Sequence, residues 1–245
     1  VRLGSSGSVN LAYYQGKYPT ATGGFTFNKG TEKSRSYIGY EYTNKNSFEE
    51  LNSDRWFELD KTKVSQYAFT TYPANTHYIN AGTDLPLNSS WNLSYDTRLN
   101  ISSNKSNADN KIDVFQFNSG TPFGESSSSI KNETRSGYWT NTLNAKLKID
   151  TSGSEWTTIF EYNYFKSNNE QNYNNRQLMP LQQYSSGDGS GISVKDIFNM
   201  QSDLVWKLPQ KYTFEAGFKH NISNSKNTTQ YLSLIHISEP TRLRR

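Results

Sequence analysis

Hydrophobic and polar residues alternate along much of this chain with a period of two, the pattern of a β-strand with two different faces. The clearest case is residues 91–101, where every second residue from Trp91 is apolar, aromatic or threonine and those between are Asn, Ser, Asp or Arg. On a helix, Asp96 and Arg98 would point to different sides and the apolar set would wrap the axis. Only an extended strand separates the two sets.

The same alternation recurs along the chain and predicts about nine strands. It is shortest or least regular in the first four segments and cleanest in the later ones. The segments are residues 9–14, 24–28, 35–44, 77–85, 91–101, 143–149, 156–164, 198–208 and 212–218.

Short connectors rich in turn-forming residues alternate with long polar connectors at residues 45–76, 102–135 and 167–191. In a meander, successive connectors lie at opposite ends of the sheet, so the long ones share one edge. Loops above about 12–15 residues are uncommon in compact domains, whereas outer-membrane barrels combine short periplasmic turns with long extracellular loops. We therefore predict an all-β fold, an antiparallel up-and-down meander of about nine strands from an incomplete transmembrane β-barrel.

Strand length and ring placement agree with this prediction. Ten residues at ~3.3 Å each, tilted by ~45°, rise about 23 Å, close to the ~25 Å apolar band of such barrels. A soluble β-sandwich or a solenoid is the alternative, but sandwich strands usually run ~5–6 residues with short loops at both ends. Two belts of rings are expected at the two membrane interfaces: Trp91, Trp156, Trp206 and Tyr212 near the short turns, and Tyr138, Trp139, Tyr162 and Tyr164 near the long loops.

Composition excludes several classes of protein. The 245 residues include 17 Tyr, 13 Phe and 5 Trp, too many rings for a disordered chain. No run of ~18 apolar residues predicts a membrane helix. The absence of Cys excludes disulfides and thiolate chemistry. The net charge of +4 comes with no basic cluster in the body of the chain, so we expect no nucleic-acid partner.

The polar positions of the strands project to one face. An Arg or Lys at the middle of a lipid face would cost about 2–4 kcal/mol, so the apolar face is predicted to meet lipid and the polar face a lumen. These side chains could pair across strands and hydrate the wall, or hold a plug and guide a polar solute. The predicted lumen-facing residues are Asp96, Arg98, Lys146, Lys148, Glu161, Asp203, Glu215 and Lys219.

The long connectors contain rings beside Asn, Asp and Gln, a mixture that suits a sugar or peptide ligand. The alternative is that these rings pack the loops onto one another as a cap. The ligand-contact candidates are Trp56, Phe57, Tyr72, Phe117 and Tyr173.

No set of residues indicates catalysis, a metal or a cofactor. His77, His220 and His236 lie far apart without ligand partners at suitable spacing, and no GxSxG is present. The glycine-rich segment at residues 187–191 lacks the GK[ST] ending of a phosphate loop and the acidic spacing of an EF-hand, so it is expected to be a flexible loop. The chain is therefore predicted not to be an enzyme and to bind no cofactor.

Residues 7–48 contain the segments SVNLAYYQGKYP, GGFTFN and YIGYEY, and the pattern continues through HYINAGTD at 77–84 and WNLSYD at 91–96. This sequence pattern resembles the start of the barrel in Bacteroidota TonB-dependent receptor-like proteins, and more narrowly the outer membrane protein beta-barrel family, over about residues 7–231. The resemblance implies the cell outer membrane and a barrel of about 22 strands around a plug domain.

The same resemblance implies partners: outer-membrane lipid, a plug and the TonB system through further parts of a longer parent, and an unknown nutrient such as a glycan, peptide or chelated metal. The alternative function is a secreted or surface β-rich binding module without transport activity.

Residues 1–231 are thus expected to be a partial barrel domain. Residues 232–245 read LSLIHISEPTRLRR, which is similar to translated sequencing-adapter read-through. We expect this segment to be a non-native tail; a natural basic tail is the alternative.

Overall fold

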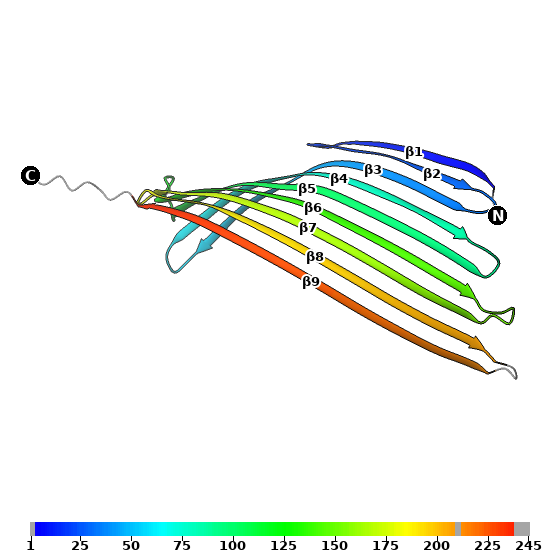
Figure 1. Cartoon of the computed structure of the whole chain (residues 1–245). Coiled ribbons are helices and arrows are strands. Elements are labelled where there is room, and N and C mark those ends of the chain that lie inside the picture. Colours follow the sequence, from blue (N-terminus) through cyan, green and yellow to red (C-terminus); the bar gives the residue numbers. More distant parts are fainter. Residues whose placement is uncertain (1–2, 209–211, 238–245) are drawn as a thin grey trace, which may run out of the picture.

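A computed structural model describes residues 3–208 and 212–237, and all of their regular structure is β-strand. The nine strands form one sheet in chain order, and each pairs antiparallel with the next (Figure 1). The predicted all-β, up-and-down meander is therefore confirmed. The strands are β1 (Gly4–Gln15), β2 (Pro19–Gly30), β3 (Arg35–Phe57), β4 (Thr62–Pro86), β5 (Trp91–Gln116), β6 (Gly124–Lys148), β7 (Glu155–Met179), β8 (Gln183–Lys207) and β9 (Thr213–Ile237).

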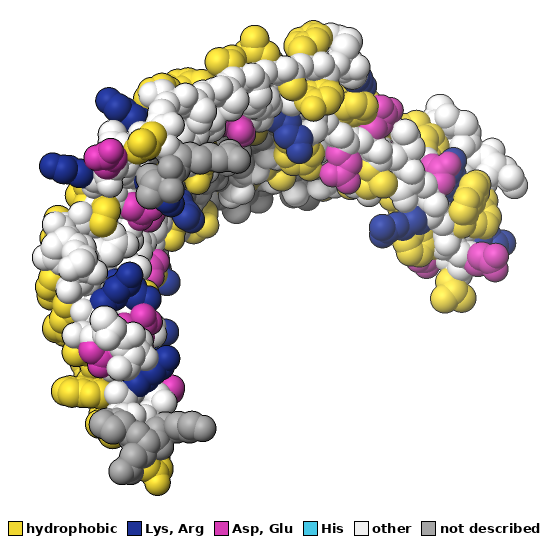
Figure 2. Space-filling model, turned by 90° about the vertical axis from the view of Figure 1, so that its right-hand side faces the viewer, with side chains coloured by type: hydrophobic (Ala, Val, Ile, Leu, Met, Phe, Trp, Pro, Cys, Tyr) yellow, Lys and Arg dark blue, Asp and Glu magenta, His cyan; other side chains and the backbone are white. Residues whose placement is uncertain are grey.

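The sheet is a single curved layer, and β1 and β9 form its two edges. Figure 2 shows it as an arc with hydrophobic side chains along the convex side. Among the described residues no hydrophobic side chain is buried, because no second layer covers either face. This excludes the soluble sandwich, which would bury an apolar core between two sheets. None of the described residues forms a helix long and apolar enough to cross a membrane.

The strands are staggered along the sheet. Following direct pairs from strand to strand, Gly4 at the start of β1 shares a row with Lys219, six residues beyond Thr213 at the start of β9. A barrel wall needs such a stagger, because its strands must tilt against the barrel axis. We call the end where β1 begins, with the turns 31–34, 87–90 and 149–154, the lower end, and the opposite end the upper end.

The predicted long loops are wrong: most of their residues are strand. Strands β3 to β8 have 23 to 26 residues each and meet at the upper end through the short connections 58–61, 117–123 and 180–182. Only β1 and β2, with 12 residues each, have about the length that spans a membrane. The upper halves carry polar side chains on both faces, so alternation is lost there while the backbone ladder, which needs no particular side chain, continues.

The glycine-rich segment 187–191 is also strand, within β8, and not a flexible loop. A Cβ on Gly187 would lie 2.6 Å from the Tyr173 ring of β7, and one on Gly189 would lie 2.7 Å from the Tyr231 ring of β9. These glycines therefore make room for rings that reach over β8 from both neighbours, a packing known to support strand glycines.

Strand β9 continues into the segment predicted as a tail. Residues 232–237 pair with β8, up to Ile237 opposite Gln183. Residues 238–245 lie outside the described residues, and the origin of the segment stays a prediction.

Candidate functional site

The register assigns every strand residue to one of two faces, because directly paired residues of antiparallel strands lie on the same face. From Asp96 the pairs lead to Thr142 on β6, then to Glu161 on β7 and Asn199 on β8. This polar face carries all eight predicted residues; that it lines a lumen stays a prediction. Its predicted members are Asp96, Arg98, Lys146, Lys148, Glu161, Asp203, Glu215 and Lys219.

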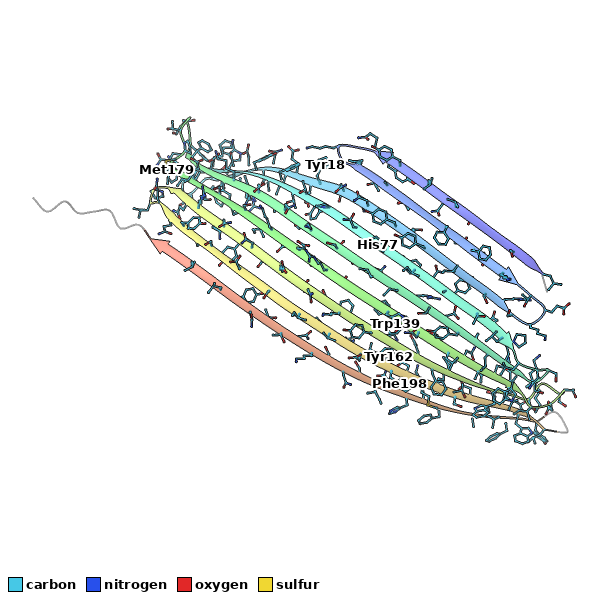
Figure 3. All side chains as sticks on the ribbon, turned by 45° about the horizontal axis from the view of Figure 1, so that its top comes forward. Tyr18, His77, Trp139, Tyr162, Met179 and Phe198 are labelled. Carbon is cyan, nitrogen blue, oxygen red and sulfur yellow. The ribbon has the colours of Figure 1, made fainter. Side chains whose placement is uncertain are left out.

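The opposite face is apolar over roughly the lower ten residues of each strand, and rings border it. Trp91 and Trp156 have centroids 6.5 Å apart near the lower end. Higher up, the Trp139 and Tyr162 centroids are 6.3 Å apart, and Phe198 pairs directly with Tyr162 (Figure 3). This arrangement matches the two ring belts predicted for a membrane-spanning band.

One predicted belt member is on the wrong face. Tyr138 belongs to the polar face, where its Oη donates a 3.0 Å hydrogen bond to Oδ1 of buried Asn163. The adjacent Trp139 takes the belt position, since neighbouring strand residues point to opposite faces.

The sequence did not single out Tyr37, whose side chain reaches across a neighbouring strand on the polar face. It lies on the polar face of β3, passes over Gly82 on β4, and donates a hydrogen bond from Oη to Asp96 Oδ1 on β5. A Cβ on Gly82 would lie 2.5 Å from the Tyr37 ring. The available signal was the glycine itself, because Gly inside a strand often marks a close approach.

Side-chain amides hold the carboxylates of β7 and β8. Asn163 Nδ2 donates to Glu161 Oε1 at 3.0 Å, and Asn199 Nδ2 donates to Glu161 Oε2 at 3.3 Å. Asn221 of β9 in turn donates to Asn199, and Gln201 Nε2 donates to Asp203 Oδ2 at 2.7 Å. These contacts fix two carboxylates in place on one wall without neutralising their charge.

Lys146 is a basic residue of the polar face that forms an ion pair with the neighbouring strand. Lys146 Nζ lies 2.6 Å from Oε2 of Glu155, a partner that the sequence did not single out, and both side chains are more than a third exposed. Such an exposed pair contributes little stability. Pairing across strands is therefore one role that this face performs.

The ring candidates do not form one site. Trp56 and Phe117 have centroids 5.5 Å apart at the upper end, and Lys63 Nζ lies 5.1 Å from the Trp56 centroid. Tyr72 on β4 and Tyr173 on β7 belong to the polar face on strands separated by two others. Apart from Phe117, the candidates are on strands and not in loops, with Phe57 the last residue of β3.

Tyr72 and Tyr173 each have a separate hydrogen-bond partner. Tyr72 Oη donates to Glu49 Oε2 at 3.1 Å, and this hydrogen bond raises the pKa of Tyr72. The Tyr173 and Ser233 hydroxyls lie 3.0 Å apart. In the described part of the chain, no three His, Asp or Glu side chains gather where they could hold a metal ion.

Above the apolar band, the outward face carries ion pairs. Glu133 lies 2.6 Å from Arg135 Nε and 3.2 Å from Lys105 Nζ, and these two cations lower its pKa. Nearer the tips, Glu125 and Asp113 each lie 3.2 Å from Lys111 Nζ and raise the pKa of that lysine.

A single open sheet with one apolar and one polar face defines the class of this structure: part of an outer-membrane β-barrel. Residues 147–242 match the model of the outer membrane protein beta-barrel family. This match and the ring-bordered band support the predicted location in the outer membrane. No curated protein matches the chain.

Solved structures give weaker likenesses. The RagAB peptide importer in its closed-closed state has 10% identity and a TM-score of 0.28, over 83% of this chain and 34% of that one. BamA from Haemophilus ducreyi lacking POTRA domains 1–3 has 10% identity and a TM-score of 0.16, over 95% and 71%. Escherichia coli Wzi, a carbohydrate-binding barrel, has 6% identity and a TM-score of 0.15, over 94% and 83%. The chain thus spans about a third of the importer's length, and its fold is established by its own strand order.

Proposed function

We propose that this chain is part of the barrel of an outer-membrane TonB-dependent transporter of the Bacteroidota type that imports a bulky nutrient. The observation that supports it most is the pairing of an apolar convex face with a charged concave face along one gently curved sheet (Figure 2). Nine strands leave this sheet wide open, so further strands are needed to close a barrel. A barrel of about 22 strands, the size that the resemblance implies, has room for a plug domain.

Within this proposal the fixed carboxylates of Glu161 and Asp203 are part of the wall that a plug or a polar solute meets. The plug and the TonB system would come from further parts of a longer parent. The nutrient is a glycan, a peptide or a chelated metal, since the polar face combines amides, carboxylates and tyrosines that suit each of them.

A surface binding module without transport is the second candidate. The cluster of Trp56, Phe117 and Lys63 at the upper end favours it, because the exposed Trp56 ring beside a cation offers a ligand contact outside any lumen.

Uptake by cells that carry the full-length parent tests the two candidates. Wild-type, deletion and complemented strains are given a defined mixture of oligosaccharides, oligopeptides and iron chelates, with and without a protonophore. Transport predicts that one class is depleted only when the protein is present, and that the protonophore stops the depletion. Binding without protonophore-sensitive depletion would favour the module, and no effect on any class would contradict both.

A further inference from the structure

Four cations follow one another on the outward face, just above the apolar band. Lys105 pairs directly with Glu133, and Arg135 is its diagonal neighbour on β6. Lys166 on β7 and Lys226 on β9 flank Val194 in one row. Together they form what we call the cation belt: Lys105, Arg135, Lys166 and Lys226.

The members of the belt lie at similar heights. Its four members lie 11 to 14 residues from the lower ends of their strands, beyond the ring row of Trp139 and Tyr162. Since rings of this kind mark the membrane–water interface, the belt lies at the level of lipid headgroups. The strands are longer on this side of the band, which is the extracellular side in outer-membrane barrels, so the headgroups belong to the outer leaflet.

The belt keeps a net positive charge. Three carboxylates share its level: Glu133, between Arg135 and Lys105; Glu170, which pairs directly with Glu133; and Asp196, which accepts a 2.7 Å hydrogen bond from Tyr162 Oη. Lys166 and Lys226 are two strand spacings apart, roughly 10 Å. Among the described residues neither Lys166 nor Lys226 forms an ion pair, so both ammonium groups are available to an anion from outside the chain. Figure 2 shows basic side chains projecting from the convex side.

A hollow of about 950 Å³ lies directly above the belt on the same face. Asn107, Asn172 and Gln230 project outward at its rim, together with the carboxylates of Glu170 and Asp188. Amides and carboxylates at this density offer both donors and acceptors to hydroxyl groups. Lys105 belongs to both the belt and the hollow, so the two zones are continuous.

We propose that this outward surface binds a phosphorylated glycolipid of the outer leaflet. The acyl chains lie on the apolar band, the phosphates contact the cation belt, and the sugar residues occupy the hollow. The inference rests on the outer-membrane position of the sheet and is independent of transport, so failure of either proposal leaves the other standing.

Lipid binding to the full-length protein, purified from outer membranes and delipidated in detergent, tests the proposal. The probes are bisphosphorylated lipid A and the same lipid with both phosphates removed, titrated by native mass spectrometry. We expect K166Q/K226Q to bind bisphosphorylated lipid A about tenfold more weakly, a change of about 1.4 kcal/mol in binding free energy, because the variant loses two charge-assisted contacts to phosphate. Inorganic phosphate should compete only weakly, since it lacks the chains and sugars.

Lys195 provides the matched control, because it lies on β8 between the two belt strands and at their height but on the polar face. K195Q should bind like the wild type, and all variants should keep heat-modifiable gel mobility. Removing the phosphates should weaken binding to the wild type about as much as the double substitution does. Equal binding of both lipids by the wild type would overturn the proposal without any variant, and so would equal losses in K195Q and the double variant.

Discussion

Tyr37 shows how single residues order the polar face. Its ring needs the open space over Gly82 to reach Asp96, two strands away. In G82A the new Cβ would lie 2.5 Å from the Tyr37 ring and 2.7 Å from Asp96 Oδ1, so the ring must move and the hydrogen bond is lost. We expect a loss of about 1–3 kcal/mol in the free energy of unfolding, measured by urea titration of the full-length protein.

Gly137 supplies the control for this prediction, because a Cβ there would meet no heavy atom within 4 Å. G137A should unfold at the wild-type urea concentration. Equal destabilisation by the two substitutions would show that the space over Gly82 has no special role.

Glu133 predicts a pH dependence. Arg135 and Lys105 hold its pKa below the ordinary value in the folded protein. The stabilisation is therefore present above the unfolded pKa of about 4.3 and is lost as the pH falls through the lower folded pKa. E133Q should lower the urea midpoint at pH 7, and this difference from the wild type should shrink on acidification below pH ~4. A difference that grows on acidification would contradict the assignment.

At the scale of elements, alternation in the sequence predicted a strand wherever one face of that strand is apolar and the other is polar. Residues 91–101 alternate because one face is apolar, and the structure places them in β5. The upper half of the same strand reads as a loop, because its two faces are both polar and no side-chain period remains. The faces of the candidate residues followed from alternation, whereas the Tyr37–Asp96 contact and the Lys146–Glu155 pair could not, because they depend on which strands are neighbours and on their register.

Substitution of the glycines of β8 is expected to disturb the packing of β9 at one position and not at another. A Cβ at Gly189 would lie 2.7 Å from the Tyr231 ring and collide with it, whereas a Cβ at Gly191 would lie 3.7 Å from the nearest heavy atom. G189V should therefore displace Tyr231 and expose the upper part of β9 to protease, and G191V should not. Limited proteolysis of the full-length protein in detergent measures this, and cleavage in both variants or in neither would contradict the packing.

At the scale of the whole molecule, the open sheet cannot exist alone in a membrane. Strands β1 and β9 leave unpaired backbone groups at the edges, and each would cost several kcal/mol in hydrocarbon. In water the convex face exposes rings and aliphatic side chains as one patch. We expect the isolated 245-residue chain to form inclusion bodies. A soluble monomer with a cooperative melt and a sharp NMR spectrum would contradict this.

The central claim is that the apolar face meets lipid and the polar face an aqueous lumen. These 245 residues contain no Cys. In the full-length protein in liposomes, with any Cys elsewhere replaced by Ser, single cysteines at 93, 94, 97, 98, 99 and 100 can carry a fluorophore. Quenching by a lipid-dissolved nitroxide and by aqueous iodide then reports whether each labelled side chain faces lipid or water. We predict lipid quenching at 93, 97 and 99 and aqueous quenching at 94, 98 and 100; aqueous quenching at all six positions, or the reverse alternation, would contradict the account.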